Sequence, residues 1–406
     1  MSQLGGGFRQ QRWCEYYLAR GHSVRLFYVG GITSVAWTDV HTVDDLRAKR
    51  AAWIDKAPPK AGVRDSRFAS IARLIKHTLL MDLFYPSIFR LLLLLNATKR
   101  RAPGVTVLLC SSPPFAMAVV GRIIKAVWGD AVFMALDMRD LWSMHTAFRG
   151  PKLHKRWIER WVVHGADDFT TVSVGLAIRF EEAFSTQPKV VYNVATHVQE
   201  LPSGDAMVDW TVLSPSLRAA SRKLVYTGSV PEGFYDLDMF VSAVEHFAAA
   251  VPDAADRLQL VFVGAGGELA SRVAQSRIPK GVFVFLPQMA HKDASLLQGH
   301  ADALLFLGYK AADNQGQVSI KLFEYFRRGR PLLPVFIRPN SDVDRLVKLY
   351  CGSCPHLNSA PDVADALSRL ARYGATGLPL TVNREADEIL KTEYDRTVER
   401  ILAGID

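Results

Sequence analysis

Short apolar runs alternate with helix-length amphipathic segments along most of the 406-residue chain. The runs have the length and the β-branched and aromatic content of buried strands. In the first half they are VRLFYV (24–29), VTVLLC (105–110), AVFMAL (131–136), DFTTVS (168–173) and KVVYNV (189–194). A loop-rich segment is expected from about residue 37 to 68, and helices over 68–100. Strands separated by helices of about 10 to 15 residues predict a parallel, doubly wound sheet, which is an α/β fold.

The same alternation starts again after an irregular stretch rich in Pro, Ser and Asp. Its strand-like runs are KLVYTG (223–228), LQLVFVGAG (258–266), VFVFLP (282–287), ALLFLG (303–308) and PLLPVF (331–336). Two Rossmann-like domains of similar size would enclose a cleft, and ligands would bind outside the carboxyl ends of the strands. We expect an N-terminal domain over 1–200, a linker over 201–222, a C-terminal domain over 223–380, and a C-terminal helix over 381–406 that packs back on the N-terminal domain.

Three glycines, Gly5 to Gly7, stand directly before the first helical pattern. A glycine turn that leads into a helix normally follows a strand, but only four residues precede Gly5. Either residues precede this methionine in the natural chain, or the N-terminal sheet lacks its first strand. We favour the first interpretation.

The charge balance is basic, with 49 Lys and Arg against 40 Asp and Glu and a net charge of +9. There is no long Lys/Arg run and no aromatic–basic RNA-binding motif, so nucleic acid is not an expected partner. The basic surface is either that of an ordinary enzyme or one that meets anionic lipid or phosphate-bearing substrates.

One apolar segment bears on membrane association. Residues 83–95 precede a basic cluster, Lys99-Arg100-Arg101, so this helix either lies on a membrane surface or faces the core, and we favour the core. No signal peptide or membrane-spanning run is recognised. We expect a cytoplasmic protein, with peripheral attachment to the inner face of the membrane as an option.

The four cysteines indicate a reducing compartment. Cys351 and Cys354 form a CxxC pair followed by Pro355 and His356. A structural zinc site needs four ligands, and no second pair lies nearby in the sequence. We therefore expect no metal site.

The segment NQGQVSIKLFEYFRRGRP (314–331) holds the strongest candidate site. Ser319 is a good N-cap, which would leave the N–H groups of residues 320–322 free for a phosphate at the positive end of the helix. Lys321 could neutralise phosphate charge. Glu324, on the same face one turn along, could accept hydrogen bonds from both hydroxyls of a ribose. The alternative is a surface helix with a Lys321–Glu324 pair.

The stretch VSIKLFEYFRRGRPLL (318–333) resembles the donor-site helix of GT-B glycosyltransferases, most of all the family 4 members that build bacterial surface polysaccharides. Nearly the whole chain shares the resemblance. In the first half, GGG…YYLARGHSVRLF is similar to the acceptor-side loop and second strand, and CSSPP, LDMRDLW and WVVHGADDFTTVSVGLAIRF follow it in the family's order. LVYTGSV and VFVGAGGE resemble the two glycine turns of the nucleotide domain.

This resemblance implies transfer of a sugar from a nucleoside diphosphate sugar to an acceptor hydroxyl, with retention of configuration, in polysaccharide or glycolipid biosynthesis. The acceptor would be lipid-linked or a saccharide, and no metal or other cofactor is expected. The implied donor-binding residues are Gly6, Gly7, Gly228, Ser229, Gly264, Gln288, Ser319, Lys321 and Glu324. The implied catalytic residues, at the cleft, are Arg139 and Asp140.

Three departures from the family pattern matter. Gly316 stands where many relatives carry the first glutamate of a pair whose second member corresponds to Glu324. The segment GSVPEGFYDLD lacks the Arg and Lys that usually follow the first glycine turn. Pro287 stands where relatives often have glycine, and it has no backbone N–H to donate. Arg327, Arg328 or Arg330 could compensate, but Arg328 and Arg330 could equally be solvated. The alternatives are a non-catalytic nucleotide-sugar-binding relative and a nucleotide-sugar epimerase.

Overall fold

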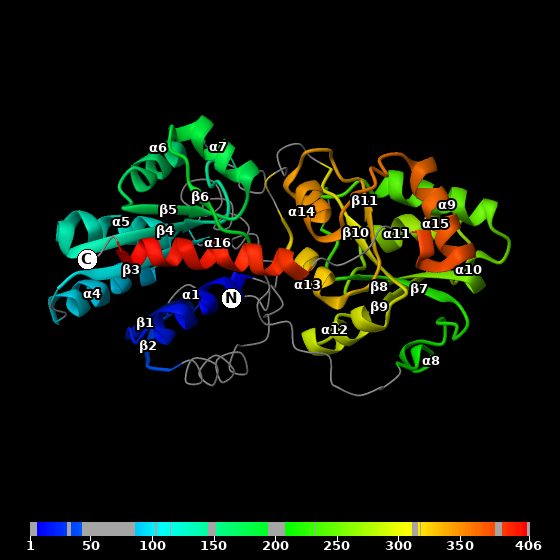
Figure 1. Ribbon diagram of the computed structural model, residues 1–406, viewed down its shortest axis with the longest axis horizontal. Coiled ribbons are helices and arrows are strands. Elements are labelled where there is room, and N and C mark those ends of the chain that lie inside the picture. Colours follow the sequence, from blue (N-terminus) through cyan, green and yellow to red (C-terminus); the bar gives the residue numbers. More distant parts are fainter. Residues whose placement is uncertain are drawn as a thin grey trace, which may run out of the picture. The chain divides into compact units, whose positions relative to one another are not determined.

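The computed structural model describes residues 6–30, 34–42, 86–101, 104–113, 115–144, 152–193, 208–231, 233–310, 316, 318–377 and 384–403. The chain divides into two compact units, Met1–Thr196 with Leu390–Asp406, and His197–Ile389. Each unit carries a parallel sheet with helices packed on it (Figure 1), which confirms the prediction of an α/β fold with two Rossmann-like domains. Residues 1–5, and the part of the expected helices (68–100) that precedes residue 86, fall outside the described residues.

The main sheet of the first unit has four parallel strands in the order β3-β4-β5-β6. Their bounds are β3 (Thr106–Ser112), β4 (Val132–Met138), β5 (Asp168–Thr171) and β6 (Lys189–Val190). The helices between them are α5 (Ala116–Trp128), which the short 3-10 helix η1 (Gly129–Ala131) follows, α6 (Lys152–Val163) and α7 (Val174–Phe184). Their inner faces bury an apolar core that includes Phe115, Met134, Trp142 and Phe180.

Strands β1 (Val24–Gly30) and β2 (Ser34–Val40) form a separate antiparallel pair among the described residues. The first run was expected in a parallel sheet, and a loop was expected from about residue 37, so both expectations were wrong here. Only three residues separate the strands, and parallel pairing needs a much longer crossover. Arg25 supports the pair by donating to Asp39 opposite, with 2.8 Å between Nη2 and Oδ2.

Two helices from opposite ends of the sequence pack within the first unit. Side chains of α1 (Gly6–Ala19) and the last part of α16 (Arg384–Ala403) share one apolar cluster, in which Trp13, Val398 and Ile401 are at most 1% exposed. Arg400 also forms an ion pair with Asp168 on β5, at 2.9 Å. The final turns of α16 are therefore part of the core of this unit.

Helix α4 (Pro86–Arg101) covers the segment for which a membrane role was considered. Its Leu91 is 1% exposed and packs with Val120 of α5. Lys99, the first residue of the basic cluster, is buried and donates to the carbonyl of Gly104 at 2.6 Å. The structure therefore supports the core-facing interpretation of this helix.

The second unit is built on five parallel strands in the order β11-β10-β7-β8-β9. The strands are β7 (Arg222–Thr227), β8 (Leu258–Val263), β9 (Phe283–Leu286), β10 (Ala303–Leu307) and β11 (Leu332–Val335). Every residue of β8 and β10 is buried, as expected for parallel strands covered on both faces.

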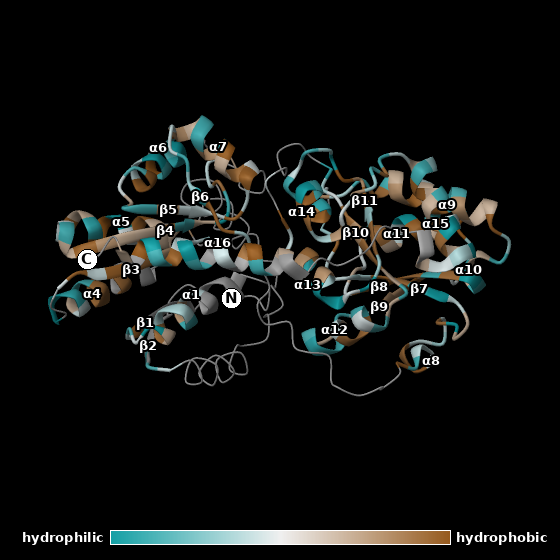
Figure 2. Ribbon diagram, in the orientation of Figure 1, coloured by the Kyte–Doolittle hydropathy of each residue, from teal (hydrophilic) through white to brown (hydrophobic). Residues whose placement is uncertain are grey.

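The helices of the second unit are α8 (Trp210–Leu213), α9 (Leu237–Ala250), α10 (Ala254–Arg257), α11 (Glu268–Gln275), α12 (His291–His300), α13 (Ile320–Arg328), α14 (Asp342–Cys351) and α15 (Ala360–Tyr373), and the 3-10 helix η3 (Gly374–Gly377) follows α15. Figure 2 shows hydrophilic and hydrophobic residues on the same helices, as expected for amphipathic helices that cover a sheet. Among the described residues, no helix has the length and apolar character needed to cross a bilayer.

Candidate functional site

The strand order of the second sheet fixes where a ligand is expected. From β7 the chain moves outward through β8 to β9, and it then returns to place β10 on the other side of β7. This reversal is a topological switch point, and ligands of parallel α/β sheets bind at the carboxyl edge beside such a point. Most of the predicted donor-binding residues lie in the segments that follow β7, β8, β9 and β10 at this edge.

The first glycine turn, directly after β7, requires glycine. Gly228 has a φ of +101°, and its N–H donates to the carbonyl of Val263 at 2.8 Å. A Cβ atom there would lie 3.1 Å from Nζ of Lys321. The turn and the Lys321 ammonium group are therefore in close contact, whereas the next residue, Ser229, has an exposed side chain.

A second glycine turn follows β8 and lies against the segment after β9. Gly264 has a φ of +77°, and its N–H donates to the carbonyl of Leu286 at 3.0 Å. A Cβ atom on it would lie 3.7 Å from the Cα atom of Gln288, which is exposed. The structure thus brings the predicted residues Gly264 and Gln288 together.

Helix α13 begins after Ser319, as predicted, but the cap differs. The Ser319 side chain makes no capping hydrogen bond. The N–H of Leu322 donates to the carbonyl of Ser319 at 3.1 Å, so that this N–H is not free as expected. Among the described residues, the N–H groups of Ile320 and Lys321 have no hydrogen-bond partner. They remain as donors at the positive end of the helix.

Lys321 is held in place by an aromatic side chain of β7. Its Nζ donates to the hydroxyl of Tyr226 at 2.7 Å and lies 4.2 Å from the centre of that ring. The Tyr226 hydroxyl in turn donates to the carbonyl of Ser229 at 2.9 Å. Burial lowers the pKa of Lys321 to about 8, against the opposing effect of the nearby Glu324. A cation therefore lies beside the first glycine turn, although it comes from another element.

Glu324 is buried and bonded to a histidine that the sequence analysis did not select. Its side chain is 8% exposed overall, and Oε1 lies 3.0 Å from Nε2 of His291, the first residue of α12. This hydrogen bond raises the pKa of His291. The Lys321–Glu324 pair considered from spacing does not form as a direct bond, because Lys321 bonds to Tyr226 instead.

Arg328, on the same helix, is 8% exposed and therefore not solvated. It donates to Oε1 of Gln298 at 3.3 Å and to the hydroxyl of Ser295 on α12. Gln298 donates to the hydroxyl of Thr227 at the end of β7, at 2.8 Å. Burial lowers the pKa of Arg328, and Glu324 opposes that shift. The Arg328 side chain thus links α13 to α12 by hydrogen bonds. Arg330, in contrast, is exposed, and it donates to the carbonyl of Gly299.

The remaining predicted residues belong to the first unit. Arg139 and Asp140 directly follow β4, and the guanidinium of Arg139 donates to the carbonyl of Pro113 at 2.7 Å. Both residues are partly exposed at the carboxyl edge of that sheet. Gly6 and Gly7 are the first residues of α1.

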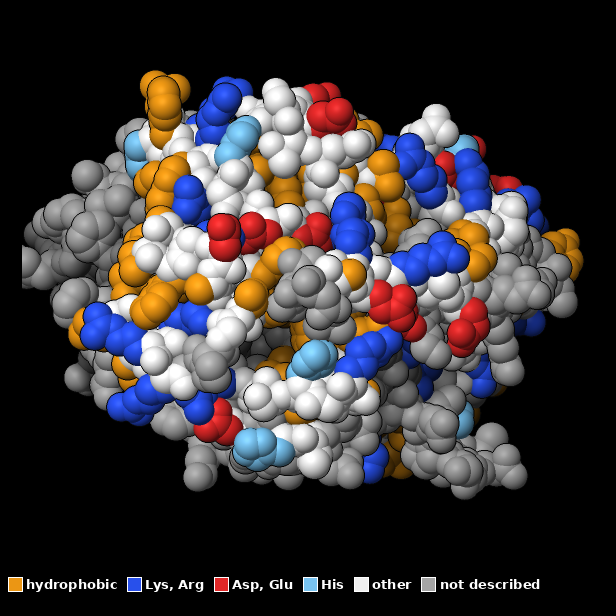
Figure 3. All heavy atoms as spheres, turned by 60° about the vertical axis from the view of Figure 1, so that its left-hand side comes forward, with side chains coloured by type: hydrophobic (Ala, Val, Ile, Leu, Met, Phe, Trp, Pro, Cys, Tyr) orange, Lys and Arg blue, Asp and Glu red, His pale blue; other side chains and the backbone are white. Residues whose placement is uncertain are grey.

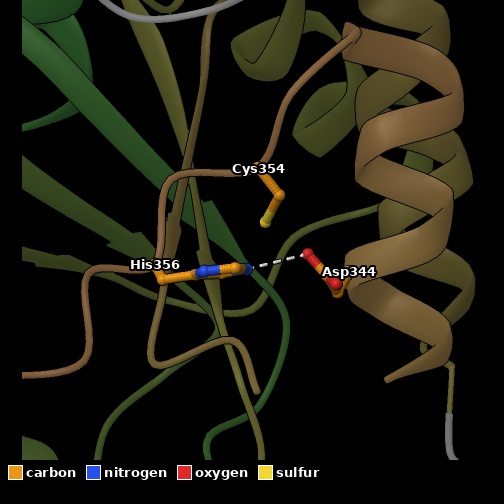
Figure 4. A group of neighbouring side chains, drawn as sticks. All are labelled: Asp344, Cys354 and His356. Atoms are coloured by element: carbon orange, nitrogen blue, oxygen red, sulfur yellow. Dashed lines mark hydrogen bonds and ion pairs between the residues drawn. The ribbon is translucent and has the colours of Figure 1, made fainter. Parts of the chain in front are cut away.

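A second cluster of polar side chains involves the CxxC segment. Asp344 of α14, Cys354 and His356 point toward one another (Figure 4), and their potential ligand atoms lie within 4.8 Å of one another. Sequence spacing did not reveal Asp344 as a partner of these residues.

The chemistry of this cluster favours a structural role over a metal site. The buried Asp344 carboxylate accepts hydrogen bonds from His356 at 3.0 Å, from Lys348 at 2.8 Å and from the N–H of Asn340 at 2.7 Å. Burial is the largest single effect and raises the pKa of Asp344, but these bonds and the Lys348 charge together outweigh it and lower that pKa to about 2. Burial raises the pKa of Cys354 to about 12. Three ligands beside an ammonium group are a poor match to the four-ligand zinc sites of proteins.

Comparison with known proteins supports the fold. No family model matches the chain, and no curated protein sequence matches it. Among solved structures, OtsA in its apo form is 11% identical, with a TM-score of 0.56 and coverage of 85% of this chain and 79% of that one. The N-terminal domain of Candida albicans trehalose-6-phosphate phosphatase is 11% identical, with a TM-score of 0.51 and coverage of 89% and 88%.

An α,α-trehalose 6-phosphate synthase from Burkholderia multivorans is also 11% identical, with a TM-score of 0.51 and coverage of 84% and 76% of the two chains. At this identity the likeness establishes the fold class and nothing finer. The chain therefore has the fold class of the GT-B proteins, with two Rossmann-like units.

Proposed function

We propose that this protein is a glycosyltransferase that uses a nucleoside diphosphate sugar as donor. The observation that carries the proposal is the convergence at the switch point of the second sheet. There the Lys321 ammonium group lies against the Gly228 turn, and the buried Glu324 carboxylate lies one turn along α13. The fold class, shared with proteins named as trehalose 6-phosphate synthases, supports the same function.

In this proposal the diphosphate lies at the start of α13, and its charge is balanced by Lys321 and the N–H groups of Ile320 and Lys321. The Glu324 carboxylate accepts hydrogen bonds from the ribose hydroxyls. The hydrogen bond between His291 and Oε1 of Glu324 fixes the orientation of this carboxylate. The segment around Gln288, beside Gly264, faces the base. During transfer the bond from the anomeric carbon to the phosphate oxygen breaks and a bond to the acceptor oxygen forms. Nucleoside diphosphate and a proton are released.

The finer features are proposals that rest on the resemblance of α13 to family 4 enzymes. They are retention of configuration, a role in polysaccharide or glycolipid biosynthesis, and a lipid-linked or saccharide acceptor. Arg139 and Asp140 would then be the catalytic residues, and Gly6 and Gly7 would lie over the donor phosphates. No metal or other cofactor is invoked, because Lys321 and the helix start supply the positive charge.

Donor binding can be tested by calorimetric titration of UDP and GDP, with and without their sugars, into the full chain. We expect Glu324→Gln to weaken binding by about tenfold or more, because a carboxylate that bonds to hydroxyls contributes about 1.5–3 kcal/mol. The matched control is Asp365→Asn on α15, where the carboxylate is exposed and distant in sequence from the site. Equal affinities in Glu324→Gln and the unchanged protein would refute the assignment of Glu324.

A second candidate function is that of a non-catalytic nucleotide-sugar binder. It is favoured by Gly316, which replaces the first carboxylate of many relatives, and by the absence of Lys and Arg from the segment GSVPEGFYDLD (228–238). Measuring donor hydrolysis beside donor affinity distinguishes the two functions. Tight binding with no hydrolysis or transfer would favour the binder.

A further inference from the structure

Helix α6 of the first unit exposes an unusual row of large apolar side chains. Leu153, Trp157 and Trp161 follow one another at intervals of four residues, and they are 75%, 74% and 42% exposed. Residues four apart lie on one face of a helix, so these side chains form a continuous stripe. The opposite face, with Val162 and Val163, packs into the core of the unit. The stripe is therefore fixed outward by the packing of the helix.

The same outward face is basic. Arg156 and Arg160 are exposed between the apolar residues, and His164 is exposed at the end of the helix. The only carboxylate of α6, Glu159, points inward and accepts hydrogen bonds from the backbone N–H groups of Trp142 and Ser143, at 2.7 and 3.0 Å. The exposed face of α6 thus combines Trp, Leu and Arg without an acidic side chain.

From here on the stripe includes Arg156 and Arg160 as well as Leu153, Trp157 and Trp161. Side chains of the neighbouring helices α5 and α7 lie at its edges. The guanidinium of Arg122 on α5 lies 4.9 Å from the centre of the Trp161 ring. On the other side Arg156 donates to the carbonyl of Ala183 at 3.3 Å, near the exposed Glu181 and Glu182 of α7. Figure 3 turns the side of Figure 1 that carries α6 forward, and hydrophobic side chains lie next to basic ones on the face it presents.

We propose that this stripe is a docking surface for a bilayer that contains anionic phospholipid. Trp has an apolar ring and a polar N–H, and it therefore favours the headgroup region. A helix with Trp and Leu beside Arg lies in the plane of such an interface, and each cation near an anionic surface adds attraction. A second copy of the chain is a poorer occupant, because a twofold contact would place the arginines of one α6 against those of the other.

The experiment is flotation of the full chain with vesicles of phosphatidylcholine alone and of phosphatidylcholine mixed with phosphatidylglycerol. We expect binding to the mixed vesicles that weakens with added salt. The double variant Arg156→Gln with Arg160→Gln should bind about 25-fold more weakly, since each cation near the surface contributes about fivefold. The double variant Leu153→Ala with Trp157→Ala should lose about tenfold or more through the apolar area that no longer inserts.

Matched controls lie in the second unit, where Val212 and Tyr373 are 80% and 67% exposed. The double variant Val212→Ala with Tyr373→Ala should bind vesicles like the unchanged protein. Equal binding by the α6 variants and the unchanged protein, or no binding to mixed vesicles, would overturn the proposal. The proposal would also be overturned if analytical ultracentrifugation showed a dimer of the unchanged protein and a monomer of the Trp157→Ala variant. None of these results depends on the donor site, because vesicle binding is measured without nucleotide.

Discussion

Lys321 is the residue whose environment most directly links structure to a measurable property. Its ammonium group is enclosed by Tyr226 and the Gly228 turn, and burial lowers its pKa to about 8. A lysine with a lowered pKa begins to lose its charge at mildly basic pH. A diphosphate prefers the charged form, so that binding above this pH requires uptake of a proton.

We therefore expect the Kd for UDP to be constant below about pH 8 and to rise above it by up to about tenfold per pH unit. Calorimetric titrations between about pH 7 and 9.5 would measure this profile. Lys321→Arg is the control, because arginine keeps its charge throughout this range. A rise of the same size in the arginine variant would show that another group causes the pH dependence.

At the scale of elements, the end of β10 packs against an unusual backbone segment. Phe336, after β11, has a positive φ of 58°, and its N–H donates to the carbonyl of Leu357 at 2.9 Å. A Cβ atom on Gly308 would collide with the carbonyl oxygen of Phe336. A backbone carbonyl cannot turn aside as a flexible side chain can, so glycine is needed here.

Gly308→Ala should lower the free energy of unfolding by about 1–3 kcal/mol, because the added methyl group forces a backbone shift in a closely packed region. Gly266→Ala is the matched control, since a Cβ atom there meets no other heavy atom within 4 Å. Urea denaturation followed by circular dichroism would measure both. Similar losses in the two variants would contradict the packing explanation.

The sequence predicted elements better than it predicted contacts. The runs that became β4, β7, β8 and β10 are recognisable because buried parallel strands are largely apolar. Strand β1 was predicted, but its antiparallel pairing with β2 was not, because the composition of a strand does not determine its partner. Likewise α4 was ambiguous until its packing partner Val120 was known.

The candidate site was predictable only where one local segment carries it. The start of α13 and the position of Glu324 follow from spacing within a single helix. The bonds from Lys321 to Tyr226 and from Glu324 to His291 join residues 95 and 33 positions apart, and no periodicity indicates them. Lys321 was predicted as a donor-binding residue, but its direct contact with the Gly228 turn could not be read from the sequence, because the two residues belong to different elements.

At the scale of the whole molecule, the first unit depends on residues from both parts of the sequence that flank the second. Ile401, on α16, is 1% exposed and packs in the cluster that contains Trp13 and Val191. Ile401→Ala should destabilise the first unit by about 2–5 kcal/mol through lost burial and a residual cavity. Ile389→Ala in the same helix is the control, because that side chain is 46% exposed.

Hydrogen exchange followed by mass spectrometry resolves the two units. We expect faster exchange in peptides from β3 to β6 in the Ile401 variant, with peptides from β7 to β11 unchanged. The Ile389 variant should exchange like the unchanged protein. Equal acceleration in both sets of peptides would mean that the chain unfolds as one cooperative body.

The shared cluster of α1 and α16 also has a consequence for biosynthesis. A ribosome releases Trp13 early, but Val398 and Ile401, which pack with it in one apolar cluster, are translated only after the whole second unit. Residues 197–389 leave the exit tunnel before them and can fold while the earlier half still exposes an apolar surface. Until α16 has been translated, the nascent first unit is thus the part that a holding chaperone would have to shield.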